Sequence, residues 1–191
     1  MLGMWTSFVG FMGCGKSTVT RLLQAATSRP LVATDDLVVD RAGLPIAGIF
    51  ARDGEPAFRR LELEVLAELD PERSLVVDTG GGVVENPAAV ALLRSRGVVI
   101  WIDAHWEVLR HRLQAQDDGT RPLVARLGWS GLEALHRRRR RLYAAAADFR
   151  LRSGESTAED VARTAMLRSL LWERRREEKR RETERRDGDR R

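Results

Sequence analysis

The chain has 191 residues, of which 43% are hydrophobic, and it carries a formal net charge of +5. This length suits one α/β domain with a sizeable core, and no apolar run reaches the roughly 20 residues of a membrane helix. A tail at residues 172–191 contributes +3 of the charge (ten Arg/Lys minus seven Asp/Glu), so the basic balance is weak support for nucleic-acid binding. The single cysteine, Cys14, excludes an internal disulfide and favours a cytoplasmic location.

Strands and helices are predicted to alternate along the body of the chain, residues 1–171. The expected strands are 6–9, 30–33, 75–78, 98–102 and 149–151. The expected helices are 16–27, 36–42, 55–69, 87–96, 107–115, 132–147 and 157–172. Such alternation predicts an α/β fold with a parallel sheet covered on both faces, whose ligands bind at the carboxyl ends of the strands. The mixed charges of the tail predict a frayed helix or a disordered end.

The glycine-rich segment after the first strand is the most informative motif. It fits the phosphate-loop pattern Gly-x-x-x-x-Gly-Lys-Ser/Thr, with Gly10, Gly15, Lys16 and Ser17 at the fixed positions. The backbone N–H groups of such a loop bind phosphate oxygens, the lysine reaches the β and γ phosphates, and the serine hydroxyl can bind Mg²⁺. Nucleotide binding is therefore predicted for Gly13, Cys14, Gly15, Lys16, Ser17 and Thr18. Cys14 is expected to be a small residue that the loop tolerates, with a redox role as the alternative.

Carboxylates, glycines and arginines follow the later strands. Asp35 can accept hydrogen bonds from a substrate hydroxyl and draw off its proton, whereas Asp36 fits a helix-capping role better. One arginine of the pair at 59–60 can face a cleft, where its planar fork suits a carboxylate. The Thr-Gly-Gly-Gly turn at 79–82 lets backbone approach a ligand or a packed helix. Only one or two of the five arginines at 137–141 can face the same cleft.

These motifs, in this order and at these spacings, resemble the shikimate kinase family. The resemblance covers residues 5 to about 165 and includes the phosphate loop, Asp35, Gly54-Glu55, Phe58-Arg59, Glu62, Thr79-Gly80-Gly81-Gly82, Arg121-Pro122-Leu123, Arg139 and Leu142-Tyr143. It implies a three-layer P-loop fold like that of nucleoside-monophosphate kinases, with a five-stranded parallel sheet flanked by helices. It further implies a substrate-binding segment near 34–62 and a lid near 115–129.

The resemblance implies transfer of the ATP γ-phosphoryl group to the 3-hydroxyl of shikimate, with Mg²⁺ as cofactor. Lys16, Asp35 and Arg121 would be catalytic. Shikimate would be bound by Asp35, Arg59, Gly81 and Arg139, and the nucleotide by Arg112 and Arg121 together with the phosphate loop. The family's small size suggests a monomer, and neither a membrane nor a nucleic acid is expected as a partner.

Two positions depart from the family pattern. Ala33 stands where the family has the first aspartate of Asp-x-Asp, and Asp78 stands where it has a small residue before Thr-Gly-Gly-Gly. An apolar strand that ends in aspartate holds Mg²⁺ in many phosphate-loop enzymes. We therefore predict that Ser17 and Asp78 form the metal site, the alternative being that Asp78 only caps a turn.

Two other functions stay open at this point. The paired arginines indicate an acidic acceptor without naming it, so another small-molecule kinase such as a gluconate kinase would also fit. The loss of the aspartate at Ala33 leaves room for a homologue that binds nucleotide but no longer catalyses.

Overall fold

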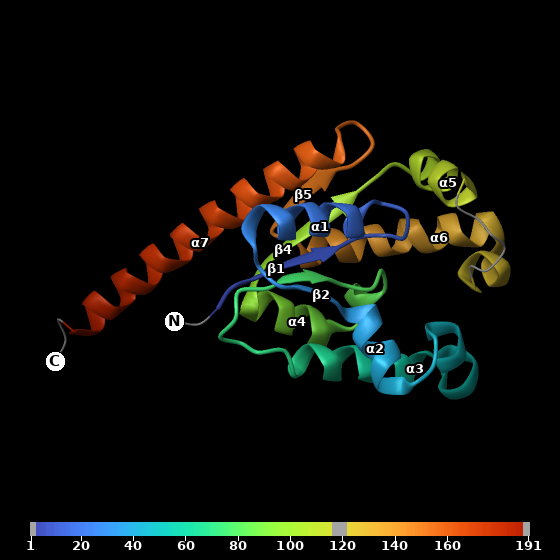
Figure 1. The fold of residues 1–191 in the computed structure, drawn as a ribbon, viewed down its shortest axis with the longest axis horizontal. Coiled ribbons are helices and arrows are strands. Elements are labelled where there is room, and N and C mark those ends of the chain that lie inside the picture. Colours follow the sequence, from blue (N-terminus) through green and yellow to red (C-terminus); the bar gives the residue numbers. More distant parts are fainter. Residues whose placement is uncertain (1–2, 116–121, 189–191) are drawn as a thin grey trace.

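The computed structural model describes residues 3–115 and 122–188. At its centre lies a five-stranded sheet with the strand order β2-β3-β1-β4-β5 (Figure 1). The strands are β1 (Trp5–Val9), β2 (Leu31–Ala33), β3 (Val76–Asp78), β4 (Gly97–Asp103) and β5 (Phe149–Arg152). Every neighbouring pair is parallel. The predicted five-stranded parallel sheet is confirmed.

Helices connect the strands and cover both faces of the sheet, so the predicted three-layer α/β fold is also confirmed (Figure 1). They are α1 (Lys16–Thr27), α2 (Thr34–Ala42), α3 (Ile46–Ala67), α4 (Pro87–Arg96), α5 (Trp106–Ala115), α6 (Pro122–Ala146) and α7 (Ala158–Gly188), with a 3-10 turn η1 (Val83–Glu85) between β3 and α4. α1 packs against α7 on one side, and α3 packs against α4 on the other.

Two helices are preceded by a helical segment that the sequence does not predict. α3 and α6 each contain a glycine with non-helical backbone angles, Gly54 at φ 77° and Gly128 at φ 61°, which separates the additional segment from the predicted helix. The predicted start at residue 55 is confirmed as the start of the second segment of α3, whereas the second segment of α6 begins before the predicted residue 132. The start of α4 is as expected: Asn86 accepts hydrogen bonds from the N–H groups of the first turn, and Pro87 follows it.

The last helix extends through most of the charged tail, for which the sequence predicts a frayed helix or a disordered end. α7 continues beyond Trp172 to Gly188 and projects from the body as a straight rod (Figure 1). Oppositely charged residues four apart, such as Arg174 with Glu178 and Glu177 with Arg181, support a helix without an apolar partner. Within the described residues, none of the helices is long and apolar enough to cross a bilayer.

Two separate hydrophobic cores divide the molecule. The larger surrounds the sheet and contains fully buried Phe8, Val77 and Ile100. The smaller joins α2 to α3 through the four buried residues Val38, Ile49, Phe58 and Val65. Since α2 begins directly at the carboxyl end of β2, the smaller core holds the α2–α3 unit beside the edge of the sheet where ligands are expected.

Candidate active site

The phosphate loop connects β1 to α1 at the carboxyl edge of the sheet. Gly10, Gly13 and Gly15 have φ angles of 153°, 76° and 93°, a region that residues with a Cβ atom rarely adopt. A Cβ atom on Gly10 would also lie 2.4 Å from the carbonyl oxygen of Ile102 in β4. Lys16 Nζ donates a hydrogen bond to the Gly10 carbonyl at 3.0 Å. The ammonium group therefore lies over the loop, at the N-terminus of α1 where anions bind well.

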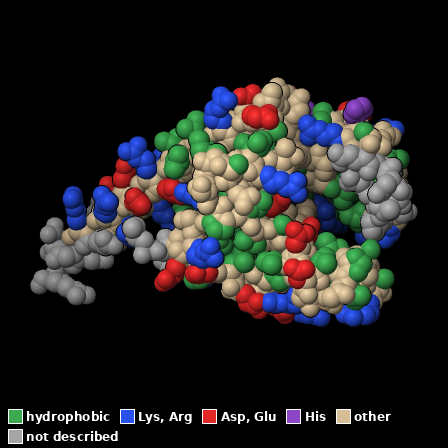
Figure 2. Space-filling model, in the orientation of Figure 1, with side chains coloured by type: hydrophobic (Ala, Val, Ile, Leu, Met, Phe, Trp, Pro, Cys, Tyr) green, Lys and Arg blue, Asp and Glu red, His purple; other side chains and the backbone are tan. Residues whose placement is uncertain are grey.

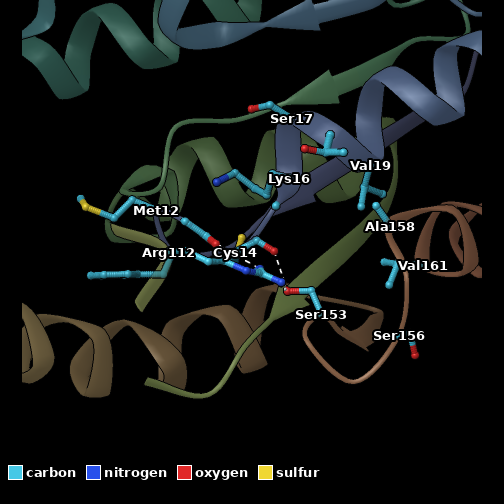
Figure 3. A pocket seen from close by; sticks show the side chains of 14 residues that line it. Met12, Cys14, Lys16, Ser17, Val19, Arg112, Ser153, Ser156, Ala158 and Val161 are labelled. Carbon is cyan, nitrogen blue, oxygen red and sulfur yellow. Dashed lines mark hydrogen bonds between the residues drawn. The ribbon is translucent and has the colours of Figure 1, made fainter. Parts of the chain in front are cut away.

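A cavity of about 470 Å³ opens beside this loop (Figure 3). Its walls include loop residues from Phe11 to Val19, Arg112 of α5, and Ser153 and Ser156 between β5 and α7. Arg112 Nη1 donates to the Gly13 carbonyl at 3.2 Å, and Ser153 Oγ donates to the Cys14 carbonyl at 2.6 Å. The structure thus gathers the predicted nucleotide-binding residues of the loop and Arg112 around one cavity.

Cys14 does not have the surroundings of a reactive thiol. Its side chain is buried, and burial raises the pKa of the thiol, with Lys16 opposing that shift. A buried thiol of raised pKa is a poor nucleophile. This placement favours the small-residue interpretation over a redox role.

A second cavity, of about 530 Å³, lies on the other side of Lys16. Lys16 and Ser17 line both cavities, which places the phosphate loop between them. The second cavity is also lined by Asp35, Asp36, Asp78, Thr79 and Gly81. Figure 2 shows the viewed face hollowed between the α2–α3 unit and the helices above it, with acidic and basic side chains along the walls.

Asp35 lies in the first turn of α2 and contributes to this second cavity. Its Oδ1 atom is buried and has no hydrogen-bond partner among the described residues. Burial raises the pKa of Asp35, Lys16 lowers it, and Asp78 raises it further. A carboxylate oxygen that is desolvated without a partner is well suited to accept a hydrogen bond from a substrate hydroxyl.

Asp78 and Ala33 are partners in the sheet. Ala33 of β2 is in register with Asp78 of β3, which is in register with Phe8 of β1. Residues directly opposite on neighbouring strands share one face of the sheet, so a carboxylate at 78 projects beside the place where one at 33 would project. Thr20 Oγ1 of α1 donates to Asp78 Oδ2 at 3.4 Å, and Ser17 lines the same cavity as Asp78.

The described residues contain no group of three or more His, Cys, Asp or Glu side chains that could enclose a metal ion. The oxygen atoms of Ser17 and Asp78 are the hard donors that Mg²⁺ prefers, and Mg²⁺ usually takes its remaining ligands from phosphates and water. These two residues therefore fit a magnesium ion that arrives with a nucleotide.

The arginines predicted to bind a carboxylate meet at a residue that the sequence analysis missed. Arg59 Nη2 of α3 and Arg139 Nε of α6 donate to the same oxygen, Glu85 Oε2, at 3.3 Å and 3.0 Å. Arg138 donates to the other oxygen of Glu85. The sequence offers one signal for Glu85, an acidic residue three positions after the triple glycine. That signal does not indicate which side chains surround it.

Each glycine of the turn after β3 lies against a different part of the site. A Cβ atom on Gly80 would lie 2.4 Å from Asp35 Oδ1. One on Gly81 would lie 3.4 Å from the Gly10 carbonyl oxygen, and one on Gly82 would lie 2.2 Å from Arg59 Nη2. The Gly81 carbonyl also accepts a hydrogen bond from the Tyr143 hydroxyl at 2.5 Å. The turn therefore links the acceptor side of the site to the phosphate loop. A Cβ atom on Gly80 or Gly82 would clash with Asp35 or Arg59, whereas one on Gly81 would make an ordinary contact.

Glu62 lies beneath Arg59 and is fully buried. Its Oε2 atom accepts from Arg59 Nη1 at 2.8 Å, whereas its Oε1 atom has no partner among the described residues. Burial raises the pKa of Glu62 to about 7; Arg59 lowers it and Asp35 adds to the rise. Arg59 is therefore positioned by a hydrogen bond to Glu62, a carboxyl group whose pKa is near neutral pH.

One predicted site residue stays without a structural account. Arg121 and the rest of the predicted lid between residues 116 and 121 lie outside the described residues. The roles of the other predicted residues toward ligands also stay predictions, although the structure brings Lys16, Ser17, Asp35, Asp78 and Gly81 to one cavity.

These features define a P-loop kinase of small molecules: a phosphate loop, a second cavity that carries a carboxylate, and a pair of arginines that converge beside the glycine turn. The chain matches the shikimate kinase family over residues 12–185. It is 46% identical to a shikimate kinase of Synechococcus sp. (strain RCC307) over 155 residues, 81% of this chain and 78% of that protein. The chain belongs to the shikimate kinase family, as its motifs predicted.

Solved structures agree with this assignment. The structure of shikimate kinase from Acinetobacter baumannii in complex with shikimate matches with a TM-score of 0.78 and 31% identity, over 88% of this chain and 93% of that one. Shikimate kinase from Aquifex aeolicus matches with a TM-score of 0.70 and 36% identity, over 86% of this chain and 94% of that one.

Proposed function

We propose that the chain is an ATP-dependent shikimate kinase that transfers the γ-phosphoryl group of ATP to the 3-hydroxyl of shikimate. The observation that carries the proposal is the arrangement of the two cavities, which adjoin at Lys16 and Ser17. A triphosphate in the first cavity would reach the acceptor in the second across this boundary. Family membership supports the identity of the acceptor, since the Acinetobacter baumannii relative is described in complex with shikimate.

The nucleotide side of the reaction is mostly a matter of positioning and charge. The N–H groups of the phosphate loop and the N-terminus of α1 hold the phosphates. Lys16 exchanges its hydrogen bond to the Gly10 carbonyl for the β and γ phosphates. The family resemblance adds Arg121 as a second positive charge on the transferring phosphoryl group, and Arg112 as a residue that contacts the adenine.

The acceptor side relies on side chains from three elements. Arg59 and Arg139 bind the carboxylate of shikimate, Asp35 accepts hydrogen bonds from ring hydroxyls, and Gly81 offers its backbone N–H. The raised pKa of Asp35 makes this carboxylate a better proton acceptor than an exposed aspartate, which suits the deprotonation of an attacking hydroxyl. Lys16, one residue of the phosphate loop, also faces this cavity.

The metal site is proposed to have moved by one strand relative to the family pattern. Mg²⁺, when bound with ATP, would neutralise charge on the β and γ phosphates. Ser17 would ligate it, and Asp78 would support it through water in place of the carboxylate missing at Ala33. The register of Ala33 with Asp78 supports the proposal, because it leaves a carboxylate at the same edge and on the same face of the sheet.

A coupled assay with ATP and a panel of acceptors tests the function. The panel contains shikimate, gluconate, homoserine and no acceptor. Turnover with shikimate alone is the expected result. Turnover with gluconate would favour the gluconate kinase alternative, and ATP binding without turnover on any acceptor would favour the catalytically impaired homologue.

The physical state is also part of the proposal. We infer a cytoplasmic monomer that has neither membrane nor nucleic-acid partners, consistent with the buried free thiol of Cys14. Light scattering after gel filtration should give the mass of one chain, 21.5 kDa. Twice that mass would contradict the monomer.

A further inference from the structure

Glu85 occupies the centre of the arginine cluster. It is the last residue of η1, which follows the triple-glycine turn directly. One of its carboxylate oxygens accepts from Arg59 Nη2 at 3.3 Å and from Arg139 at 3.0 Å (Nε) and 2.5 Å (Nη2). A single carboxylate thus engages both guanidinium groups that the proposed function assigns to the carboxylate of the acceptor.

The arginines of the cluster around Glu85 already have carboxylate partners. The positive groups are Arg59, Arg138 and Arg139, and their partners are Glu55, Glu85 and Glu62, the last of which has a pKa of about 7. The arginines lower the pKa of Glu85 in spite of its partial burial, so this carboxylate is ionised at neutral pH. A further carboxylate that entered the cluster would find both Nη groups of Arg59 and the paired Nε and Nη2 donors of Arg139 already engaged, with the buried Nε of Arg59 left without a partner. An acidic acceptor therefore has to displace a carboxylate that is already there.

The partners of Glu85 differ in depth. The side chain of Arg139 is 7% exposed and that of Arg59 is 15% exposed, whereas that of Arg138 is 66% exposed. Arg138 binds the oxygen of Glu85 that the inner arginines do not contact. Glu85 can therefore leave the two inner arginines and still keep a charged partner at the rim. The displacement costs less than it would if Glu85 became an unpaired buried charge.

We propose that Glu85 is an internal competitor for the acceptor's carboxylate, which occupies the Arg59–Arg139 pair until the acceptor displaces it toward Arg138. The inference rests on the proposed function, in which these two arginines bind the acceptor. While Glu85 binds the two arginines, the enzyme cannot bind the acceptor's carboxylate. The apparent affinity for the acceptor is therefore the intrinsic affinity multiplied by the fraction of molecules in which Glu85 has left the arginines. Glu85 thereby sets the affinity of the pocket for carboxylates and neutralises its arginines in the free enzyme.

The opposite role would be a fixed brace that orients the two arginines for the acceptor. The two roles predict opposite changes when the charge of Glu85 is removed. A competitor releases the arginines, so the acceptor binds more tightly. A brace leaves the arginines misplaced, so the acceptor binds more weakly.

The test compares Glu85→Gln with the wild-type enzyme in steady-state kinetics. Glutamine keeps the shape of the side chain and removes its charge. We expect the KM for shikimate to fall by about tenfold, which is the change produced if Glu85 occupies the arginines in about ten molecules for each one in which it does not. The KM for ATP should stay unchanged. The matched control is Glu133→Gln, which removes the same charge on α6 from a pair with Arg137 and should leave both constants unchanged.

A neutral acceptor separates competition from other effects. The methyl ester of shikimate cannot compete for the arginines through charge, so Glu85→Gln should leave its kcat/KM unchanged. A KM for shikimate that rises or stays constant in Glu85→Gln would overturn the proposal. If that variant fails to fold, Glu85→Asp, whose shorter side chain reaches the inner arginines less well, should also lower the KM. A wild-type enzyme that is inactive on shikimate would refute the proposed function instead.

Discussion

The nucleotide cavity and the acceptor cavity adjoin at Lys16 but are built in different ways. The phosphate loop is made of backbone, with Gly10, Gly13 and Gly15 at positive φ, and it rests on the large core around the sheet. The acceptor cavity is lined by Asp35, Asp78 and Gly81. The arginine cluster does not line this cavity; it lies against Gly82 of the same glycine turn and consists of charged side chains from α3, η1 and α6. The nucleotide cavity is therefore defined by local geometry, whereas the acceptor side also depends on charges that must balance over long sequence distances.

This difference implies that the two sides can be perturbed separately. Residues of the loop should govern turnover and ATP, whereas residues of the arginine cluster should govern the acceptor. The following variants test that separation, from the largest expected effect to the smallest.

Replacement of Lys16 should have the largest effect. Lys16→Ala removes a charge that stabilises the transferring phosphoryl group, and a loss of kcat on the order of 10³-fold is expected by analogy with other charges at this position of the reaction. The dissociation constant for shikimate, measured by calorimetry without nucleotide, should change far less than kcat, although Lys16 also lines the acceptor cavity. Lys179→Ala, at the other lysine of the chain, is the control and should behave as wild type. An equal loss of shikimate binding in Lys16→Ala would show that the two sides are not separate.

Asp78 lines the acceptor cavity together with Ser17 and tests the proposed metal site. Asp78→Ala should reduce Mg²⁺-dependent turnover by about 10- to 100-fold, the usual cost of losing a residue that supports a metal from its outer shell. Adding Ala33→Asp to this variant should restore part of the activity, because the two positions are in register. Near-normal turnover of the single variant over a range of Mg²⁺ concentrations would refute the role of Asp78.

Arg139 should affect the acceptor only. Arg139→Met removes a charge-assisted hydrogen bond worth roughly 1.5–3 kcal/mol, which corresponds to a rise of roughly 10- to 150-fold in the KM for shikimate. The KM for ATP should stay constant. Arg137→Met is the matched control in the same run of arginines, since its side chain is 71% exposed and pairs with Glu133. A comparable change in the KM for ATP would contradict the assignment of Arg139.

Glu62 should give the smallest effect on turnover, because it is expected to act on stability. Its pKa is raised from 4.5 to about 7 in the folded state, so the folded state binds more protons than the unfolded one in this range. The free energy of unfolding should therefore be highest below the unfolded-state pKa and fall as the pH rises from there through 7, by up to about 3 kcal/mol.

Urea unfolding at about pH 5 and about pH 8 measures the contribution of Glu62. The Glu62→Gln variant should lose this part of the pH dependence. Glu64→Gln, at an exposed position of the same helix, should keep it. The interpretation fails if Glu62→Gln and the wild type respond to pH in the same way.

The sequence predicted the sheet, the order of the elements and the phosphate loop because each depends on a local pattern. Apolar runs mark the strands, and Gly-Lys-Ser at 15–17 follows the first of them. The same pattern placed Asp35 and Asp78 correctly at the carboxyl edge, since the strands that precede them are parallel. The family and its fold could therefore be predicted from the sequence.

The charge network of the acceptor side could not be predicted in the same way. Arg59 and Arg139 were identified by resemblance, but Glu85, which joins them, lies 26 and 54 positions from them in sequence. A contact between residues so far apart in the sequence leaves no local pattern from which it could be predicted. The helical segment at 46–53 was also missed. Gly54 does interrupt the helix, as the sequence indicates, but a second short helix before that break was not predicted from the sequence.

The position of Lys16 has a practical consequence for chemical labelling. Of the 33 basic residues other than histidine in the chain, Lys16 and Lys179 alone are lysines, and Lys16 lies in the phosphate loop with its ammonium on the Gly10 carbonyl. Amine-reactive probes that carry a phosphate mimic should therefore modify this protein at one internal site. Protection of that site by ATP would then report nucleotide occupancy directly, without an enzymatic assay.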